Sequence, residues 1–314
     1  MSATHPVPFS ASSARATLLV LLSAISFGGI SVITVFASRE GMAVLNLVFW
    51  RFLFAAIVLF AIASADVRAH WRAGIGLFVA GGLLQAVCTY MSLSSLRFIP
   101  ASVVAFLFFT YPAWLALTSA ARGTDPLTPK RGIILLIAMA GVALMIGIPG
   151  VGSGARLNVV GIALALGSAL LYSTYLPIVN HLQRGIPQIP AAFFIIFGSL
   201  LSFFLAGVLL SQPWTNGLAL SALALPGTPR AWIYVLLLAL VSTVMAFLAL
   251  MAGLRTLGST RTSIIATAEP FFTTILAVVF LAEGLRWTTL VGGACIAGAV
   301  VAIVLEREVR TAND

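Results

Sequence analysis

The chain has 314 residues, of which 61% are hydrophobic and only 8% are charged. No soluble domain can bury that much apolar surface, so the composition excludes a soluble fold and makes the lipid bilayer the solvent. The net charge of +9 is then a matter of membrane topology rather than of nucleic-acid binding, because no soluble module offers a basic face. The length fits about ten spans of roughly 20 residues with short loops.

Apolar segments follow one another along the chain with short polar interruptions. We expect an uncleaved first helix at 16–37, since this stretch exceeds the apolar core of a secretory signal and runs on into further spans. The other predicted spans are 43–64, 74–93, 99–120, 131–149, 157–178, 191–211, 232–252, 261–282 and 288–305. The predicted fold class is an all-α membrane protein of ten transmembrane helices.

Basic residues are distributed unevenly between the predicted loops. With the N-terminus in the cytoplasm, the cytoplasmic side receives Arg15, Arg68, Arg72, Arg122, Lys130, Arg131, Arg184, Arg255, Arg261, Arg307 and Arg310. The other side receives Arg39, Arg97, Arg156, Arg230 and Arg286. Since cytoplasmic loops are enriched in basic residues, we expect both termini in the cytoplasm of a bacterial-type inner membrane.

One pattern of residues occurs twice at a fixed spacing. Arg97 and Pro112 in the first half correspond to Arg255 and Pro270 in the second, with an offset of 158 residues. The same offset relates Leu96 to Leu254, Leu127 to Leu285, and Asp125 to Glu283. This spacing indicates a duplicated membrane unit, which is typical of transporters. Because each unit has five spans, the second must enter the membrane from the opposite side, so the repeats are predicted to be inverted.

The duplication divides the chain into five parts. We expect an N-terminal tail at 1–15, a first five-helix repeat at 16–150, a linker at 151–156, a second repeat at 157–305 and a tail at 306–314. The glycines around the linker are not a nucleotide-binding loop, because no strand precedes them. Small residues in the fifth and tenth spans favour close packing within one chain, and we expect a monomer.

Catalytic and metal-binding chemistry has no candidate residues. His5, His70 and His181 lie in the tail or in loops, and no metal-ligand spacing or nucleophile motif occurs in any span. Cys88 and Cys295 lie within apolar segments and form no disulfide framework. We therefore predict no enzyme, no metal and no cofactor. The absence of a P-loop signature argues against ATP as a direct energy source.

Two charged residues fall within predicted spans. A charge at the bilayer centre costs about 2.5–3.5 kcal/mol on insertion scales, which makes Arg51 and Glu269 functional candidates. Pro270 follows Glu269 and removes one backbone donor, so we expect a kink there and another at Pro112. These kinks are candidate gating points. Glu269 either binds a substrate ammonium, carries a proton, or accepts a structural contact from Arg51 or a helix end.

Polar and aromatic residues recur at matching depths in the two halves. Gln85 corresponds to Thr243, and Tyr111 to Glu269, at the offset of 158. Phe106 and Phe109 share one helical face, which predicts a largely apolar cavity suited to hydrophobic or aromatic amino acids. Each hydroxyl taken singly is as well explained by bonding to the preceding turn. The candidate substrate-binding residues are Gln85, Thr89, Tyr90, Phe106, Phe109, Tyr111, Tyr172, Ser173, Tyr175, Thr243, Thr267 and Glu269.

Three short motifs accompany the repeat: Trp50-Arg51-Phe52, Tyr111-Pro112, and Glu269-Pro270 followed by Glu283. Together they make nearly the whole chain resemble the EamA-type members of the drug/metabolite transporter superfamily. The resemblance implies that spans 1, 3, 4, 6, 8 and 9 line a central cavity, with spans 5 and 10 at the periphery. It places Arg51 off the cavity, so a structural pair or snorkelling is favoured there over substrate contact.

The predicted function is a secondary transporter that exports small organic solutes by alternating access. Members of the resembled family export amino acids and other metabolites, so amino acids are the expected substrates. The alternative is a multidrug or other metabolite exporter with Glu269 as the cation or proton partner. Phosphorylated substrates are disfavoured, because Arg51 is the only cation available inside a span. The expected partners are a small-molecule substrate and membrane lipid.

Overall fold

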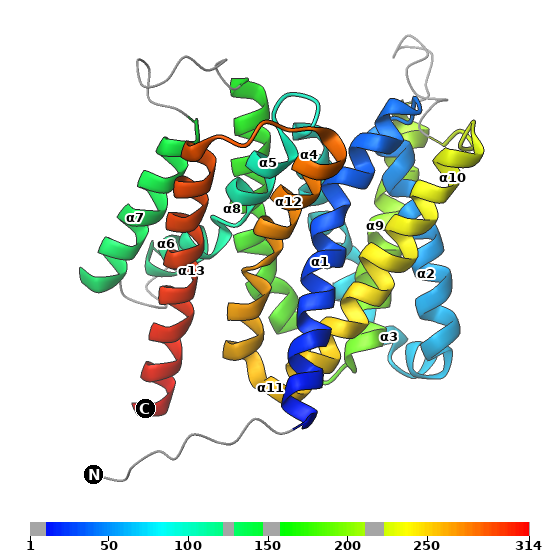
Figure 1. Cartoon of the computed structure of the whole chain (residues 1–314). Coiled ribbons are helices and arrows are strands. Elements are labelled where there is room, and N and C mark those ends of the chain that lie inside the picture. The colour runs from blue at the N-terminus through cyan, green and yellow to red at the C-terminus, as the bar shows by residue number, and fades with distance from the viewer. Residues whose placement is uncertain (1–10, 122–128, 147–157, 211–222, 314) are drawn as a thin grey trace.

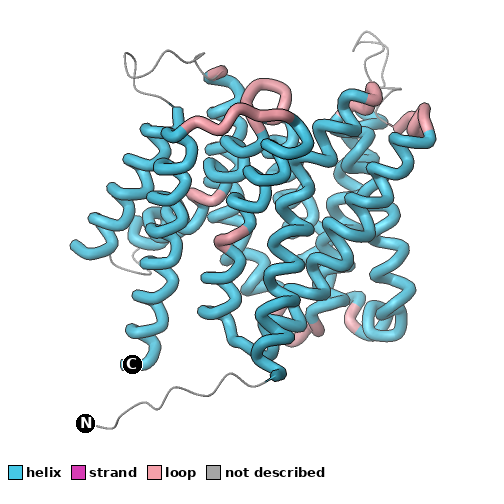
Figure 2. Tube along the Cα trace, viewed as in Figure 1, coloured by secondary structure: helices cyan, strands magenta, loops and turns pink. Residues whose placement is uncertain are grey.

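The computed structural model describes residues 11–121, 129–146, 158–210 and 223–313, and these residues form helices and short loops without any strand (Figure 2). Within these ranges six helices are long and apolar enough to cross a membrane, and they fall on predicted spans one, two, three, six, seven and eight. Shorter apolar helices occupy parts of the other four predicted spans.

The helices of the first half are α1 (Ala11–Arg39), α2 (Val44–Ala69), α3 (Trp71–Gly76), the π-helix η1 (Leu77–Gly81), α4 (Gly82–Ser95), α5 (Ala101–Phe108), α6 (Tyr111–Ala121) and α7 (Pro129–Ile146). Those of the second half are α8 (Val159–Leu182), α9 (Gln188–Leu210), α10 (Pro229–Leu236), the π-helix η4 (Leu237–Met245), α11 (Ala246–Ala266), α12 (Glu269–Leu281) and α13 (Trp287–Asn313).

The helices that begin the two halves run in opposite directions. In Figure 1, α1 runs from the lower to the upper end of the molecule and α8 from the upper to the lower end. Each is followed by a glycine in the left-handed region, Gly41 with φ of 84° and Gly185 with φ of 78°. Glycine adopts this conformation without a Cβ clash, so both helices stop sharply and the chain turns back.

The fourth and ninth predicted spans are each broken in two. Helix α5 ends at Phe108 and α6 begins at Tyr111, while α11 ends at Ala266 and α12 begins at Glu269. These ends are separated by the same 158 residues as the prolines that follow them. Proline cannot donate a backbone hydrogen bond to the preceding turn, so each helix is interrupted just before it. The two breaks are therefore equivalent features of the two halves.

The predicted loop between spans eight and nine differs from the structure. The sequence predicts an interruption at 253–260, whereas α11 includes this segment and ends at Ala266. The segment contains glycines but no proline, so the chain can turn here while its backbone stays helical (Figure 1). The helix ends instead at the break before Glu269.

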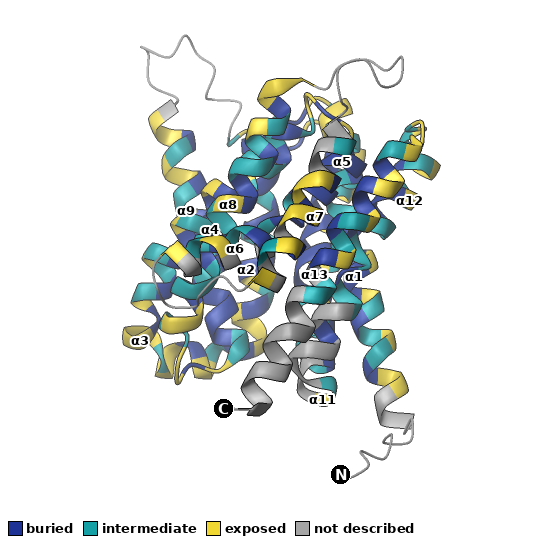
Figure 3. Cartoon of the chain, turned by 90° about the vertical axis from the view of Figure 1, so that its left-hand side faces the viewer, coloured by how far each residue is buried: buried dark blue, intermediate teal, exposed yellow. Residues whose placement is uncertain are grey.

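Large apolar side chains cover the outside of the molecule. Leu136 on α7 is 70% exposed and Leu209 on α9 is 65% exposed. Figure 3 shows exposed residues along the outward faces of these helices and buried residues between them. A soluble protein would not leave such surfaces in water, whereas lipid solvates them without cost.

Helix pairs meet closely where glycines remove the side chain. A Cβ on Gly198 of α9 would overlap the carbonyl oxygen of Phe78 in η1, and one on Gly82 would overlap the backbone of Gly198. The Ser199 hydroxyl donates to the Gly82 carbonyl oxygen across this contact at 3.0 Å. In a bilayer, close backbone approach and interhelical hydrogen bonds replace the hydrophobic effect as the source of helix association.

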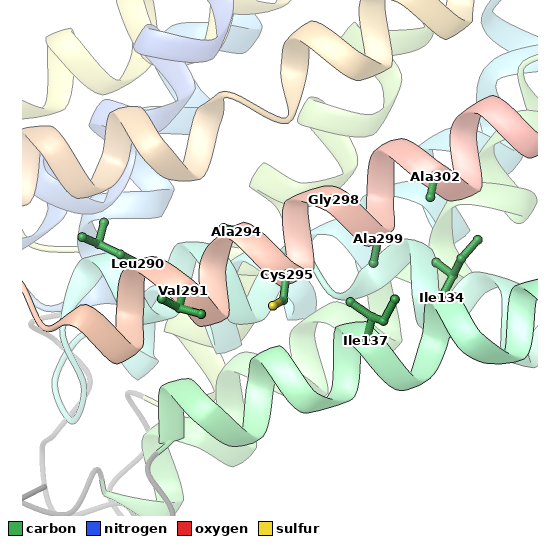
Figure 4. Close-up of a pocket in the computed structure, with 9 residues that line it drawn as sticks. All are labelled: Ile134, Ile137, Leu290, Val291, Ala294, Cys295, Gly298, Ala299 and Ala302. Atoms are coloured by element: carbon green, nitrogen blue, oxygen red, sulfur yellow. The ribbon is translucent and has the colours of Figure 1, made fainter. Parts of the chain in front are cut away.

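The predicted close packing of the fifth and tenth spans corresponds to the pair α7 and α13. A Cβ on Gly141 would lie 2.6 Å from the carbonyl oxygen of Gly292. Figure 4 shows the two helices side by side, with a groove of about 570 Å³ between their aliphatic side chains and Cys295. The groove is almost wholly apolar, as expected for a surface that faces lipid tails.

The Gly198 contact generates a stability prediction. Gly198→Ala should lower the unfolding temperature of the purified protein in detergent, because overpacking of this kind costs about 1–3 kcal/mol. Gly298→Ala is the matched control, since a Cβ there meets nothing within 4 Å. It should leave the unfolding temperature unchanged or raise it, as alanine favours helix. Equal unfolding temperatures for both variants would contradict the proposed packing.

Candidate functional site

A cavity of about 720 Å³ lies between the two halves. Its lining comes from α1, α2, α4, α5 and α6 of the first half and from α8, α9, η4, α11 and α12 of the second. None of the described residues of α7 and α13 takes part. The cavity is thus a shared feature of both halves, and α7 and α13 lie apart from it.

Most of the predicted substrate-binding residues lie in this lining. They are Gln85, Thr89, Phe109, Tyr111, Tyr172, Tyr175, Thr243, Thr267 and Glu269. Three others lie elsewhere. Tyr90 follows Thr89 on another face of α4, and its side chain is 42% exposed. Phe106 is buried, with its ring centre 5.2 Å from that of Phe271. The Ser173 hydroxyl donates to the Leu170 carbonyl oxygen at 2.6 Å. Contact with substrate remains a prediction for the nine lining residues.

Aromatic rings form one wall of the cavity, next to the break between α5 and α6. The rings of Tyr111 and Tyr172 meet edge to face with centroids 4.9 Å apart. Tyr175 stacks on Tyr172 at 5.3 Å, and Phe108 lies 5.1 Å from Tyr172 on the other side. Such contacts stabilise the rings by about 0.5–1.5 kcal/mol per pair beyond their area burial. The wall therefore offers flat apolar surface with hydroxyl tips.

Glu269 lies at the first turn of α12, directly after the second break. Gly28 of α1 lets the two helices approach, since a Cβ there would lie 3.2 Å from the Glu269 carbonyl oxygen. The carboxylate lines the cavity and makes no hydrogen bond or ion pair with any residue that the structure describes. The N-terminus of a helix favours a negative charge. The suggested pairing with Arg51 is not observed, so the carboxylate is open to a ligand.

Arg51 lies in the cavity wall, contrary to the expectation that its span would be off the cavity. The side chain is 94% buried, with 6% exposed, and its Nε donates to the Thr243 hydroxyl at 2.8 Å. Its guanidinium carbon lies 5.3 Å from the centre of the Phe52 ring. Both α2 and α9 contribute to the lining, so two more spans line the cavity than the resemblance implied.

Sequence reasoning missed further lining residues. Ser23 of α1 and Thr262 of α11 line the cavity with buried hydroxyl oxygens that have no partner among the described residues. Ala192, Ile195 and Ile196 of α9 contribute aliphatic surface. No sequence signal marks the aliphatic ones, because most residues of α9 are apolar.

A carboxylate joins the two halves beside the broken helices. Glu283, just beyond α12, accepts from the Ala101 amide at 2.7 Å and from the Ser102 hydroxyl at 2.8 Å and amide at 3.3 Å. These amides open α5 and would otherwise lack partners within the helix. The tie holds the start of α5 to the end of α12. The repeat counterpart, Asp125, lies outside the described residues.

Metal chemistry finds no support in the geometry. Across the described ranges, no group of three or more His, Cys, Asp or Glu side chains is placed to hold a metal ion. The arrangement instead combines an aromatic wall, scattered hydroxyls and two charges of opposite sign. Such a lining is suited to noncovalent binding of a small polar molecule that has an apolar part.

Comparison with known proteins gives one family. The model described as "EamA-like transporter family" matches twice, at residues 14–147 and 159–305. No curated protein matches the chain. A solved structure described only as "Crystal structure of protein" superimposes with a TM-score of 0.60 at 21% identity, over 94% of this chain and 99% of that one. This likeness concerns the fold alone.

The Glu283 tie can be tested by hydrogen exchange. Glu283→Ala should raise amide exchange in the first turn of α5 by about 5- to 30-fold, because two backbone donors lose a charged acceptor. Peptides that cover 101–108 would be measured by mass spectrometry in detergent or nanodiscs. Glu40→Ala, which removes contacts to Thr228 and Arg230 instead, is the control. Unchanged exchange in Glu283→Ala would show that the tie does not exist.

Proposed function

The chain belongs to the EamA-like transporter family of membrane transporters for small solutes, and on that premise we propose that it exports amino acids by alternating access. Hydrophobic and aromatic amino acids are the proposed substrates. The observation that carries this proposal is the cavity shared by both halves, with its aromatic wall and its open carboxylate.

The size and polarity of the cavity support an amino acid. Its volume of about 720 Å³ lies within the usual range for small-molecule sites. Tyr111, Tyr172 and Tyr175 provide surface for an apolar side chain, and Glu269 can accept from an ammonium group. We assign substrate contact to these four and to Gln85, Thr89, Phe109, Thr243 and Thr267.

Alternating access would use the equivalent parts of the two halves. We propose ten spans in two inverted five-helix repeats, with Pro112 and Pro270 marking the points about which α5–α6 and α11–α12 rearrange. The matched breaks and the opposite directions of α1 and α8 support this arrangement. The Glu283 tie would hold one end of the cavity closed and would break when that end opens.

The proposed setting is a bacterial-type inner membrane with both termini in the cytoplasm. The uneven distribution of basic residues supports this orientation. We propose a monomer, because residues of both halves already complete the cavity within one chain. The linker at 151–156 and residues 1–10 of the N-terminal tail lie outside the described residues, whereas residues 306–313 belong to helix α13.

The open carboxylate of Glu269 also favours a second candidate, the export of organic cations. In that case Glu269→Gln should abolish the transport of a cationic drug by the reconstituted protein, because a neutral amide cannot balance the cation. Wild-type protein that moves no cationic drug would exclude this candidate.

Reconstitution tests the main proposal. Purified protein in liposomes should take up radiolabelled threonine, methionine or phenylalanine, with saturation and with counterflow against an internal pool of the same amino acid. Saturable counterflow distinguishes a carrier from a channel. Liposomes without protein are the control, and a pH gradient would show whether protons are coupled. No uptake across a broad amino-acid panel would remove this substrate class.

A further inference from the structure

The cavity is lined by one basic side chain, Arg51, and one acidic side chain, Glu269, and neither pairs with a charged group among the described residues. We propose that Arg51 binds the carboxylate of the substrate and Glu269 its ammonium group, so that the site selects zwitterionic α-amino acids over amines and acids. This inference rests on the proposed function and deepens it, because it assigns to Arg51 a specificity role that neither the family nor the sequence gives it.

The side chain of Arg51 has three nitrogens that can donate hydrogen bonds. Its Nε is used by the Thr243 hydroxyl, and its two terminal nitrogens make no hydrogen bond or ion pair with the described residues. Arg51 is among the residues that line the cavity, so these nitrogens are available to a ligand bound there. Two parallel N–H groups of a guanidinium match the two oxygens of a carboxylate.

Thr243 and Phe52 orient the guanidinium of Arg51. The Thr243 hydroxyl accepts from Arg51 Nε and donates to the Leu238 carbonyl oxygen at 2.7 Å, five residues earlier in the π-helix η4. The Phe52 ring lies against the guanidinium. Arg51 is therefore held from two sides while its far edge remains free. π-Helical turns often occur at functional sites. The first half has one at the equivalent place, because adding the repeat offset of 158 to the residues of η1 makes them overlap the start of η4.

Arg51 and Glu269 determine the charge balance of the cavity. An unpaired charge at membrane depth is costly, and the fold carries two of them in one cavity without joining them. A lone amine would satisfy Glu269 and leave Arg51 unpaired, and a lone carboxylate would do the reverse. A zwitterion satisfies both. The two groups come from different halves, so the substrate would bridge the halves that alternating access must move.

Competition by substrate fragments tests this assignment. The probe is radiolabelled L-phenylalanine taken up by liposomes that contain the full-length protein. The competitors are unlabelled phenylalanine, 2-phenylethylamine, which lacks the carboxylate, and 3-phenylpropionate, which lacks the ammonium group. For wild type, each fragment should compete at least about 10-fold more weakly than phenylalanine, since each leaves one charged group unpaired.

The variants should change selectivity in opposite directions. Arg51→Gln should weaken the binding of phenylalanine about 10- to 100-fold. In this variant 2-phenylethylamine should compete as well as phenylalanine, while 3-phenylpropionate should still compete poorly. Glu269→Gln should weaken phenylalanine similarly and admit 3-phenylpropionate instead. Arg286→Gln and Asp66→Asn, which change exposed residues away from the cavity, should keep wild-type competition. Gel filtration would confirm that each variant is folded.

If Arg51→Gln does not fold, Thr243→Val decides the question. This change keeps the Arg51 side chain but removes the Thr243 hydroxyl that orients it. The binding of phenylalanine should therefore weaken several-fold, while that of 2-phenylethylamine should change little. Two outcomes in Arg51→Gln or Thr243→Val would overturn the role of Arg51: an equal loss of competition for all three ligands, or a selectivity the same as that of wild type. Neither outcome would contradict amino-acid export. Wild-type protein that transports no phenylalanine or other amino acid would remove both proposals together.

Discussion

Inside a bilayer no water is present to satisfy exposed backbone groups, so a span can be interrupted only where it faces protein or a polar cavity. Two spans of this chain are interrupted, before Tyr111 and before Glu269, at positions separated by the repeat offset. Both of these residues line the shared cavity. The prolines create the breaks, and the cavity makes them tolerable. The position of the aromatic wall and of the open carboxylate follows from this constraint.

Low dielectric gives the few charges of the cavity a large effect. The structure holds Arg51 through Thr243 and Phe52 and places Glu269 at a helix N-terminus, yet neither has a charged partner in the part of the chain that the structure describes. A purely structural ion pair would have brought the two together. Arg51 belongs to the first half and Glu269 to the second, and both line one cavity, so a zwitterion that contacts both would link binding energy to movement of the halves.

Much of this architecture could be predicted from the sequence, because apolar length, the repeat offset and the two prolines determine the spans and their breaks. The rotation of each helix could not. An amphipathic helix shows its inner face in its sequence, but α9 and the part of α2 around Arg51 are mostly apolar, so the sequence does not indicate that Arg51 and Ile196 face the cavity. Tyr90 and Ser173 lie outside the lining for another reason: each directly follows a lining residue, and successive residues of a helix point to different faces. The uninterrupted α11 shows that a short turn without proline can remain helical.

The central claim is that two oppositely oriented halves share one cavity. Single cysteines in place of Arg39, after the first helix of one half, and Arg184, after the first helix of the other, would test it in intact cells or sealed vesicles. Cys88 and Cys295 would first be replaced by alanine. A membrane-impermeant maleimide should modify only position 39 from the outside and only position 184 from the cytoplasmic side. Modification of both positions from the same side would contradict the inverted arrangement and the transport mechanism built on it.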